Sequence, residues 1–492
     1  MLILALVLTP TFAGIAAFAV RGDPLRRALL VLTAVAHTGM TAACWVVRPS
    51  PVFNGSLALD APGLLFLSIT TALFLAAATY GLGYLSHEKH VPEKDFEEGF
   101  LFTNAPEAIF TGCLLLFLAA MTLVTISHHF GLLWVAVEAT TLASAPLIYF
   151  HRHHRSLEAT WKYLLICSVG IALALLGNFF LAVSTSGPGH ESTPLLLGEL
   201  VRNAPQFRVP LLKAAFLFLL VGYGTKMGLA PLHTWLPDAH SESPSMISAL
   251  LSGALLNCAF LAILRALQVC AAAGQAAFCQ ELFVCFGLVS MAVAAVFILG
   301  QSDYKRMLAY SSVEHMGILA LGIGLGGAAT FGAMLHAVNH SLIKAALFLV
   351  AGNILAAYKT KSTAEVRGVF RVLPVSGMLW IAGFFAVTGS PPFGPFLSEF
   401  TILKAALDQG HSAIAVAYLA LLALVFVGMA GVVLRMAQGT PSSEMKTATS
   451  SEALLAILPS GLLVAAVLVL GVYIPPFFSN ALHEAAQTLG GF

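Results

Sequence analysis

Lys226 is the residue of this 492-residue chain whose type and surroundings most strongly indicate chemistry. It follows the apolar run 216–220, and Pro231 comes soon after it. A lysine at the centre of a membrane helix costs roughly 2.5–3.5 kcal/mol of insertion free energy. Proline removes a helix donor and frees a carbonyl, which membrane-depth backbone tolerates only where protein or water covers it. We therefore expect Lys226 to lie at a broken transmembrane helix, where it carries or gates a charge.

Three further basic residues share one face of a single helix. His336, His340 and Lys344 recur at every fourth position of LHAVNHSLIKAALF, and residues four apart lie on the same side of an α-helix. At 1.5 Å per residue they form a polar stripe about 12 Å long. Unperturbed histidines titrate near 6.5, so they suit the steps of a proton relay.

A second helix break and four more ionisable residues complete the candidate set. Discontinuous helices in the two halves of a chain are typical of transporters. With an effective dielectric constant near 20, charges about 5–6 Å apart interact by roughly 3 kcal/mol, so moving a carboxylate near Lys226 would switch whether the lysine holds a proton. The predicted proton path also contains Glu138, Glu314 and His315 (at the beginning of a span) and Glu399, and the predicted breaks lie at Pro231, Pro391, Pro392 and Pro395.

Each of these residues also has a purely structural interpretation. A buried histidine such as His336 or His340 can simply bond a backbone carbonyl, and Lys344 and Glu399 can be helix-end side chains or a structural ion pair. Glu138 taken alone can be structural as well. We favour the relay because these residues occur together across the middle of the predicted spans.

The composition excludes a soluble protein. The chain is 59% hydrophobic and 10% charged, with a mean hydropathy of +0.89, whereas soluble domains are about 45–50% apolar and about 25% charged. The net charge of +1 gives no sign of nucleic-acid binding. The seven cysteines form no CxxC pair, so we expect no cofactor or metal site in this chain.

We interpret HRHHR at 151–155 as an orientation anchor rather than a metal or phosphate site. GIGLGG at 322–327 has no preceding strand, so we do not interpret it as a dinucleotide site.

Apolar windows of about 20 residues predict an all-α polytopic membrane protein with fourteen spans. We expect one membrane domain, 1–492, with two inverted five-helix repeats. Of the 24 Lys and Arg residues, 16 lie in the odd-numbered loops and 6 in the others, which places the odd loops in the cytoplasm and both termini outside. The polar stretch 86–106 is expected to be a cytoplasmic connector or surface helix, and 187–210 an outside loop. The spans are 1–20, 28–47, 60–84, 107–127, 131–150, 160–184, 211–230, 245–267, 281–300, 308–327, 331–356, 374–400, 412–436 and 453–474, grouped as N-terminal helices (1–106), first repeat (107–267), second repeat (281–436) and last helix with its tail (453–492).

Over nearly its whole length the chain resembles the antiporter-like, proton-conducting membrane subunits of respiratory complex I and membrane-bound hydrogenases. The blocks that carry the resemblance are KMGLAPLHTWLPDAHSESPS, SDYKRMLAYSSVEHMG, NHSLIKAALFLVAGN and SPPFGPFLSEF. Within this family, the chain is most similar to the F subunits of hydrogenase-4, in the formate-hydrogenlyase group, through LPDAHSESPSMISALLSGALLN and SSVEHMGILALGIG. The resemblance implies fourteen helices with the seventh and twelfth broken, a Glu–Lys pair at Glu138 and Lys226, an ionisable twelfth-helix residue at Glu399, and a relay at His340 and Lys344.

The chain departs from the family pattern in the eighth helix. The family commonly places a central Lys or His there, where this chain has Ser252 and Asn257. We expect these residues to hold waters, or the Glu314/His315 pair to bridge the gap. Alternatively, the channel is partly disabled.

The resemblance implies a proton-translocating subunit of a membrane-bound hydrogenase or complex-I-like assembly in a bacterial or archaeal cytoplasmic (inner) membrane. Other membrane subunits and a hydrophilic redox arm would be its partners, and the arm would carry the iron–sulfur clusters and, in a hydrogenase, nickel–iron. Two alternatives stay open: a subunit of a multi-subunit sodium/proton antiporter, and a non-pumping scaffold or partner of an inorganic-carbon uptake system.

Overall fold

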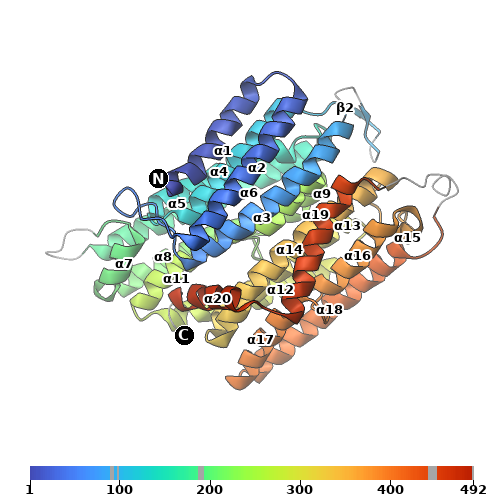
Figure 1. Cartoon of the computed structure of the whole chain (residues 1–492). Helices are drawn as coiled ribbons and strands as arrows, with labels where there is room; N and C mark the ends of the chain where they lie inside the picture. The colour runs from blue at the N-terminus through green and yellow to red at the C-terminus, as the bar shows by residue number, and fades with distance from the viewer. Residues whose placement is uncertain (89–92, 97–98, 187–192, 442–451, 490–492) are drawn as a thin grey trace.

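The computed structural model describes residues 1–88, 93–96, 99–186, 193–441 and 452–489, which form a bundle of long helices lying side by side (Figure 1). The first half contains α1 (Leu2–Ala19), α2 (Asp23–Val46), α3 (Ala61–His87), α4 (Glu107–Ile126), α5 (Phe130–Ile148), α6 (His154–Thr185), α7 (Leu197–Asn203), η1 (Ala204–Gln206), α8 (Val209–Met227), α9 (Trp235–Glu242), α10 (Ser245–Leu250), the π-helical η2 (Leu251–Leu255) and α11 (Leu256–Ala272). The second half contains α12 (Ala276–Ile298), α13 (Tyr304–Leu325), α14 (Ala328–Tyr358), α15 (Val369–Val372), α16 (Pro374–Val387), α17 (Gly394–Asp408), α18 (Ser412–Ala437), α19 (Leu454–Val472) and α20 (Pro476–Thr488).

The prediction of an all-helical polytopic membrane protein is confirmed. Within the described residues, thirteen helices are long and apolar enough to cross a membrane, the eighth being the continuous segment Ser245–Ala272. The remaining expected span, 374–400, is divided into α16 and α17, which are separated by a break. The seventh span is broken as well, between α8 and α9.

Both breaks begin at a glycine with a positive φ. Gly228 ends α8 with φ +86°, and Gly389 follows α16 with φ +62°. Glycine adopts this left-handed region without the steric cost that a side chain brings. The prolines that follow, Pro231 and Pro391, prevent the helix from resuming at once because they lack a backbone N–H.

Two polar connections contain short elements of secondary structure. The stretch 86–106 contains an antiparallel pair of very short strands, β1 (Glu93–Lys94) and β2 (Leu101–Phe102), where a surface helix was considered, while its residues 89–92 and 97–98 lie outside the described part. The expected outside loop 187–210 includes helix α7, which packs its Leu197 and Leu200 against the core. Short amphipathic segments of this kind lack the long periodicity that marks a helix in sequence.

The tenth span begins earlier than expected. Asp303 caps α13 by accepting hydrogen bonds from the backbone N–H groups of Lys305 and Arg306, so the helix starts at Tyr304 rather than near residue 308. Glu314 and His315 consequently lie in the middle of the helix, not at its beginning.

Several of the polar candidate residues, Ser252, Asn257, Glu314 and His315, lie on the two helices that the bundle encloses completely. The membrane-length windows of Ser245–Ala272 and of α13 are 100% buried, whereas that of the peripheral helix α18 is 22% buried. Helices α6 and α8 approach closely: a Cβ at Gly222 would lie 2.5 Å from the backbone nitrogen of Ala174. This contact brings the end of α8, with Lys226, against α6.

Candidate proton-transfer site

Lys226 is completely buried one residue before the end of α8, at the break. Its ammonium donates hydrogen bonds to Thr141 Oγ1 at 2.6 Å and to Tyr163 OH at 2.8 Å. The same nitrogen lies 4.7 Å from the centre of the Tyr163 ring, in a cation–π contact. Three helices, α5, α6 and α8, therefore hold one cation.

Glu138 reaches Lys226 through a threonine rather than directly. Thr141 Oγ1 donates to Glu138 Oε2 at 3.0 Å and accepts from the lysine. Glu138 and Thr141 lie three residues apart on α5, which places them one above the other on the same helix face. Tyr163 is held in turn by Ser144, whose Oγ lies 2.7 Å from its hydroxyl oxygen. The result is a hydrogen-bonded row from carboxylate to ammonium.

The break beside Lys226 is covered by protein. The carbonyl of Thr225, in the last turn of α8, accepts a hydrogen bond from the Trp235 indole N–H at 2.8 Å. The N–H of Ala230, before Pro231, donates to Ser290 Oγ at 2.9 Å. Protein side chains thus satisfy these two backbone groups at the discontinuity, as a break at membrane depth requires.

A second row of polar residues connects α13, α14 and α17. His315 Nδ1 and His336 Nε2 are 2.8 Å apart, and His336 Nδ1 is 2.9 Å from Ser398 Oγ. The rings of His315 and His340 have centroids 5.0 Å apart. Glu399, the residue after Ser398, is buried, and its Oε1 has no hydrogen-bond partner among the described residues.

Lys344 and Glu314 lie further along the same two helices. Lys344 Nζ donates to the carbonyl of Leu308 at 2.8 Å. Oε2 of Glu314 and both ring nitrogens of His340 are buried and have no hydrogen-bond partner within the described chain. The helix face predicted from the four-residue spacing is entirely buried, since His336, His340 and Lys344 each have an exposed fraction of 0%.

The second break contacts Glu399 directly. A Cβ at Gly389 would overlap the carboxylate of Glu399, so the segment between α16 and α17 fits around this side chain. Pro391 and Pro392 are exposed at the turn of the break, while Pro395 is buried in the first turn of α17. The break therefore extends from the protein surface to the buried carboxylate.

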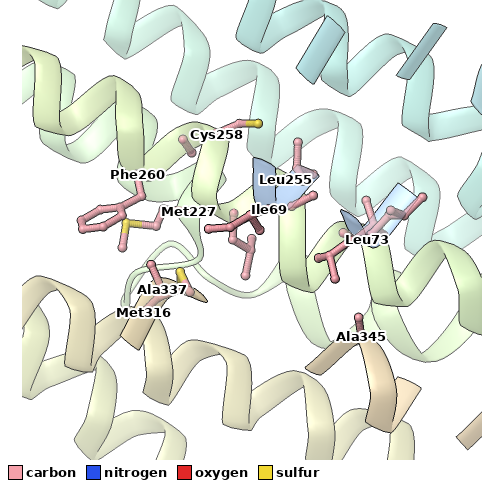
Figure 2. Close-up of a cluster of buried hydrophobic side chains, with 14 of the residues drawn as sticks. Ile69, Leu73, Met227, Leu255, Cys258, Phe260, Met316, Ala337 and Ala345 are labelled. Carbon is pink, nitrogen blue, oxygen red and sulfur yellow. The ribbon is translucent and has the colours of Figure 1, made fainter. Parts of the chain in front are cut away.

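Apolar packing around the eighth span lies between the two rows, and the buried ring of His240 lies beside it, with ring centroids 6.1 Å from Trp235 and 5.5 Å from Phe348 of α14. Figure 2 shows buried apolar side chains of α3, α8 and the eighth span, with Met227 of α8 near Met316 of α13 and Ala337 of α14. The polar residues of this region bond locally: Ser252 Oγ lies 2.8 Å from Ser312 Oγ, and Asn257 Nδ2 donates to Ser341 Oγ at 2.6 Å. Oδ1 of Asn257 is buried and has no partner in the part of the chain that the structure describes.

A cavity of about 550 Å³ lies at the end of the bundle where the odd-numbered loops meet. HRHHR contributes three of its lining residues, His151, His153 and Arg155. His151 is held between Tyr84 OH at 3.0 Å and Asn104 Oδ1 at 2.8 Å. Burial lowers the pKa of His151 to about 3, with a smaller contribution from nearby His153, so it is neutral. This motif is thus built into a cavity, which its interpretation as a simple orientation anchor did not anticipate.

Sequence reasoning missed the hydroxyl partners of the charged residues. Thr141, Tyr163 and Ser398 contact Lys226 or His336 in the structure. The signal for Thr141 was present, because it lies one helical turn after Glu138. Tyr163 and Ser398 come from distant segments and resemble many other buried hydroxyl residues.

Comparison with known proteins agrees with this arrangement. Residues 127–426 match the family model described as NADH:quinone oxidoreductase/Mrp antiporter, TM. The chain is 37% identical to the hydrogenase-4 component F homolog of Methylacidiphilum infernorum (isolate V4) over 353 residues, 71% of this chain and 72% of the relative.

Two solved structures share the whole fold. A chain of the archaeal membrane-bound sulfane sulfur reductase superposes with a TM-score of 0.86 at 20% identity, covering 99% of this chain and 97% of that one. A chain of the Mrp complex from Dietzia sp. DQ12-45-1b gives a TM-score of 0.84 at 18% identity, with coverages of 99% and 97%. The family match spans more than half of the chain and contains both broken helices and every charged residue of the two rows. This protein is therefore a member of the NADH:quinone oxidoreductase/Mrp antiporter family of multi-pass membrane proteins.

Proposed function

We propose that this chain is the proton-translocating membrane subunit of a redox-driven complex of the hydrogenase-4 or complex I type. The observation that carries the proposal is the setting of Lys226, a buried ammonium at a helix break with Thr141, Tyr163 and the Glu138 carboxylate in one hydrogen-bonded row. The 37% identity to a hydrogenase-4 component F homolog supports this choice among the family's complexes.

The row from Lys226 to Glu138 provides a route for a proton. Thr141 Oγ1 accepts a hydrogen bond from the ammonium and donates its own hydrogen to the carboxylate. A concerted shift along these two bonds moves one positive charge from α8 to α5 without moving the helices. Tyr163 fixes the ammonium, so the lysine is held in position for this transfer.

The second row continues the path toward the twelfth span. His340, His315 and His336 are spaced to pass a proton from Lys344 toward Glu399. Transfer across the apolar packing between the rows requires water, and the unpaired Oδ1 of Asn257 together with the Ser252–Ser312 contact are polar groups of the described chain that could hold it.

In this proposal the electron-transfer chemistry belongs to partner subunits. We propose neighbouring membrane subunits and a hydrophilic arm that carries iron–sulfur clusters and, in a hydrogenase, nickel–iron. The excess of Lys and Arg in the odd-numbered loops orients the chain in a bacterial or archaeal inner membrane with both termini outside.

The test is redox-driven proton uptake into everted vesicles that contain the assembled complex. Lys226→Met is expected to abolish most of the uptake while electron transfer in the soluble arm continues, because the variant removes the carrier and leaves the redox centres intact. Uptake at the wild-type rate by an assembled Lys226→Met complex would refute the proposal.

A second candidate function is sodium/proton antiport, which is favoured by the TM-score of 0.84 to a chain of an Mrp complex. A sodium-dependent pH change in vesicles without any electron donor would select this alternative. The eighth span, which has Ser252 and Asn257 where the family commonly has a Lys or His, instead favours a non-pumping scaffold, including a partner of inorganic-carbon uptake. Proton transport that survives simultaneous neutralisation of Glu138, Lys226 and Glu399 would support the scaffold.

A further inference from the structure

We propose that His315, His336 and Glu399 form a binding site for a divalent transition-metal ion, and that zinc fits it best. One nitrogen of each imidazole and one carboxylate oxygen lie within 4.8 Å of one another. Within the described residues, this is the group of His, Cys, Asp and Glu side chains that satisfies this spacing. All three residues are buried, and imidazole with carboxylate is a ligand set that zinc takes in proteins.

The hydrogen bonds around His336 leave one of its nitrogens free to bind a metal. Ser398 Oγ donates to the carbonyl of Pro395 at 2.9 Å, so it accepts from the Nδ1–H of His336, also at 2.9 Å. Nε2 of His336 therefore carries a lone pair, which points toward Nδ1 of His315. A metal-binding histidine is commonly oriented in this way, by a hydrogen bond from its other nitrogen.

The spacing of the ligands is close to that of a zinc site. Zinc binds imidazole nitrogens at about 2.0–2.1 Å, which puts two ligands of a tetrahedral ion about 3.3 Å apart. The nitrogens of His315 and His336 are 2.8 Å apart, so the rings must separate by about half an ångström to admit the ion. The metal would take the place of the hydrogen on Nδ1 of His315, which moves to Nε2 of the same ring, and water would complete the tetrahedron.

A bound cation would provide a partner for the buried carboxylate of Glu399, the third ligand. Oε1 of Glu399 is buried without a hydrogen-bond partner among the described residues. An ionised carboxylate without a partner is costly to bury, and a divalent cation beside Glu399 removes that cost.

A bound ion would block the second row, because it takes the place of the proton shared by His315 and His336. This consequence rests on the proposed function, whereas the binding itself does not. The claim that the site binds a metal and the claim that the metal inhibits transport can therefore be refuted independently.

The experiment is an optical titration of the purified full-length chain with cobalt(II), followed by displacement with zinc. Tetrahedral cobalt gives visible ligand-field bands, so the readout is independent of transport. We expect one high-affinity equivalent in the wild type that is lost in His336→Gln and Glu399→Gln. His37→Gln is the matched control, because His37 is a buried histidine of α2 bonded to Thr71 and Thr122.

A milder variant keeps the test decisive if a ligand variant does not fold. Ser398→Ala removes only the oxygen that orients His336, and we expect it to weaken cobalt affinity by about 10–100-fold. Identical bands and affinities in the wild type and in the variants of Ser398, His336 and Glu399 would overturn the site, since exposed histidines would then bind the ion. Binding by the wild type without any effect of zinc on proton transport would overturn the block alone.

Discussion

Glu138→Gln is expected to slow proton translocation by removing the charge that stabilises the protonated form of Lys226. The two hydrogen bonds through Thr141, of 3.0 and 2.6 Å, hold Glu138 Oε2 and Lys226 Nζ within about 5.6 Å of each other. At this separation and an effective dielectric constant near 20, the attraction is about 3 kcal/mol. That energy corresponds to about a hundredfold change in the protonation equilibrium of the lysine.

The expected loss of rate is somewhat smaller, because Glu138 is only half-buried and solvent screens part of its field. We expect proton uptake to fall between about tenfold and a hundredfold. Thr141→Val keeps both charges and removes the bridge, so it separates the electrostatic from the hydrogen-bonding contribution. The assay is fluorescence quenching by a pH-sensitive dye in everted vesicles, energised by the electron donor of the complex, with electron transfer recorded in parallel.

Lys213→Met is the matched control for this experiment. Lys213 lies on the same helix as Lys226, and its ammonium sits 4.9 Å from the Phe278 ring centre, outside the hydrogen-bonded row. The Lys213→Met complex should take up protons at the wild-type rate. Wild-type uptake by Glu138→Gln in a fully assembled complex would show that the carboxylate does not set the protonation of Lys226, and the electrostatic reasoning would be wrong.

Three further predictions concern the break at Gly389, the packing of α8 and the cavity at the end of the bundle. Gly389→Ala should lower proton uptake and cost about 1–3 kcal/mol of stability, because alanine is strained at φ +62° and its Cβ displaces Glu399; vesicle uptake and thermal unfolding in detergent measure the two effects. Gly222→Ala should lower the unfolding temperature, since its Cβ would lie 2.5 Å from the facing backbone, whereas Gly461→Ala, with no atom within 4 Å, should not. His151 has a pKa lowered from 6.5 to about 3, so the unfolded chain binds its proton first; thermal stability should fall as the pH drops below about 6.5, and His151→Asn should lack part of this loss.

Several features of this protein were predictable from the sequence because they depend on local or additive physics. A mean hydropathy of +0.89 predicts membrane spans, whatever the tertiary arrangement of the helices. The four-residue spacing of His336, His340 and Lys344 places them on one helix face, and all three are buried in α14. Glycine and proline near Lys226 and Glu399 predicted breaks that the structure contains.

The expectations that failed depended on weaker local signals. Of the two possibilities considered for 86–106, a connector or a surface helix, the described residues contain a pair of short strands and no separate helix. Helix α13 starts at its Asp303 cap, ahead of the apolar window that predicted it. Apolar windows report the membrane-depth part of a helix and carry no information about its polar first turn.

Tertiary packing alone decided which groups Lys226 contacts. Its partner Tyr163 belongs to α6, and the close approach of α6 and α8 at Gly222 makes this contact possible. Packing also brought apolar side chains such as Met227 and Met316 together between α8 and α13, which no spacing along the chain encodes. The sequence determined that charges would be buried at two helix breaks, since burial and backbone geometry follow from residue type. The structure decided their partners and their separation, because those depend on how distant helices meet.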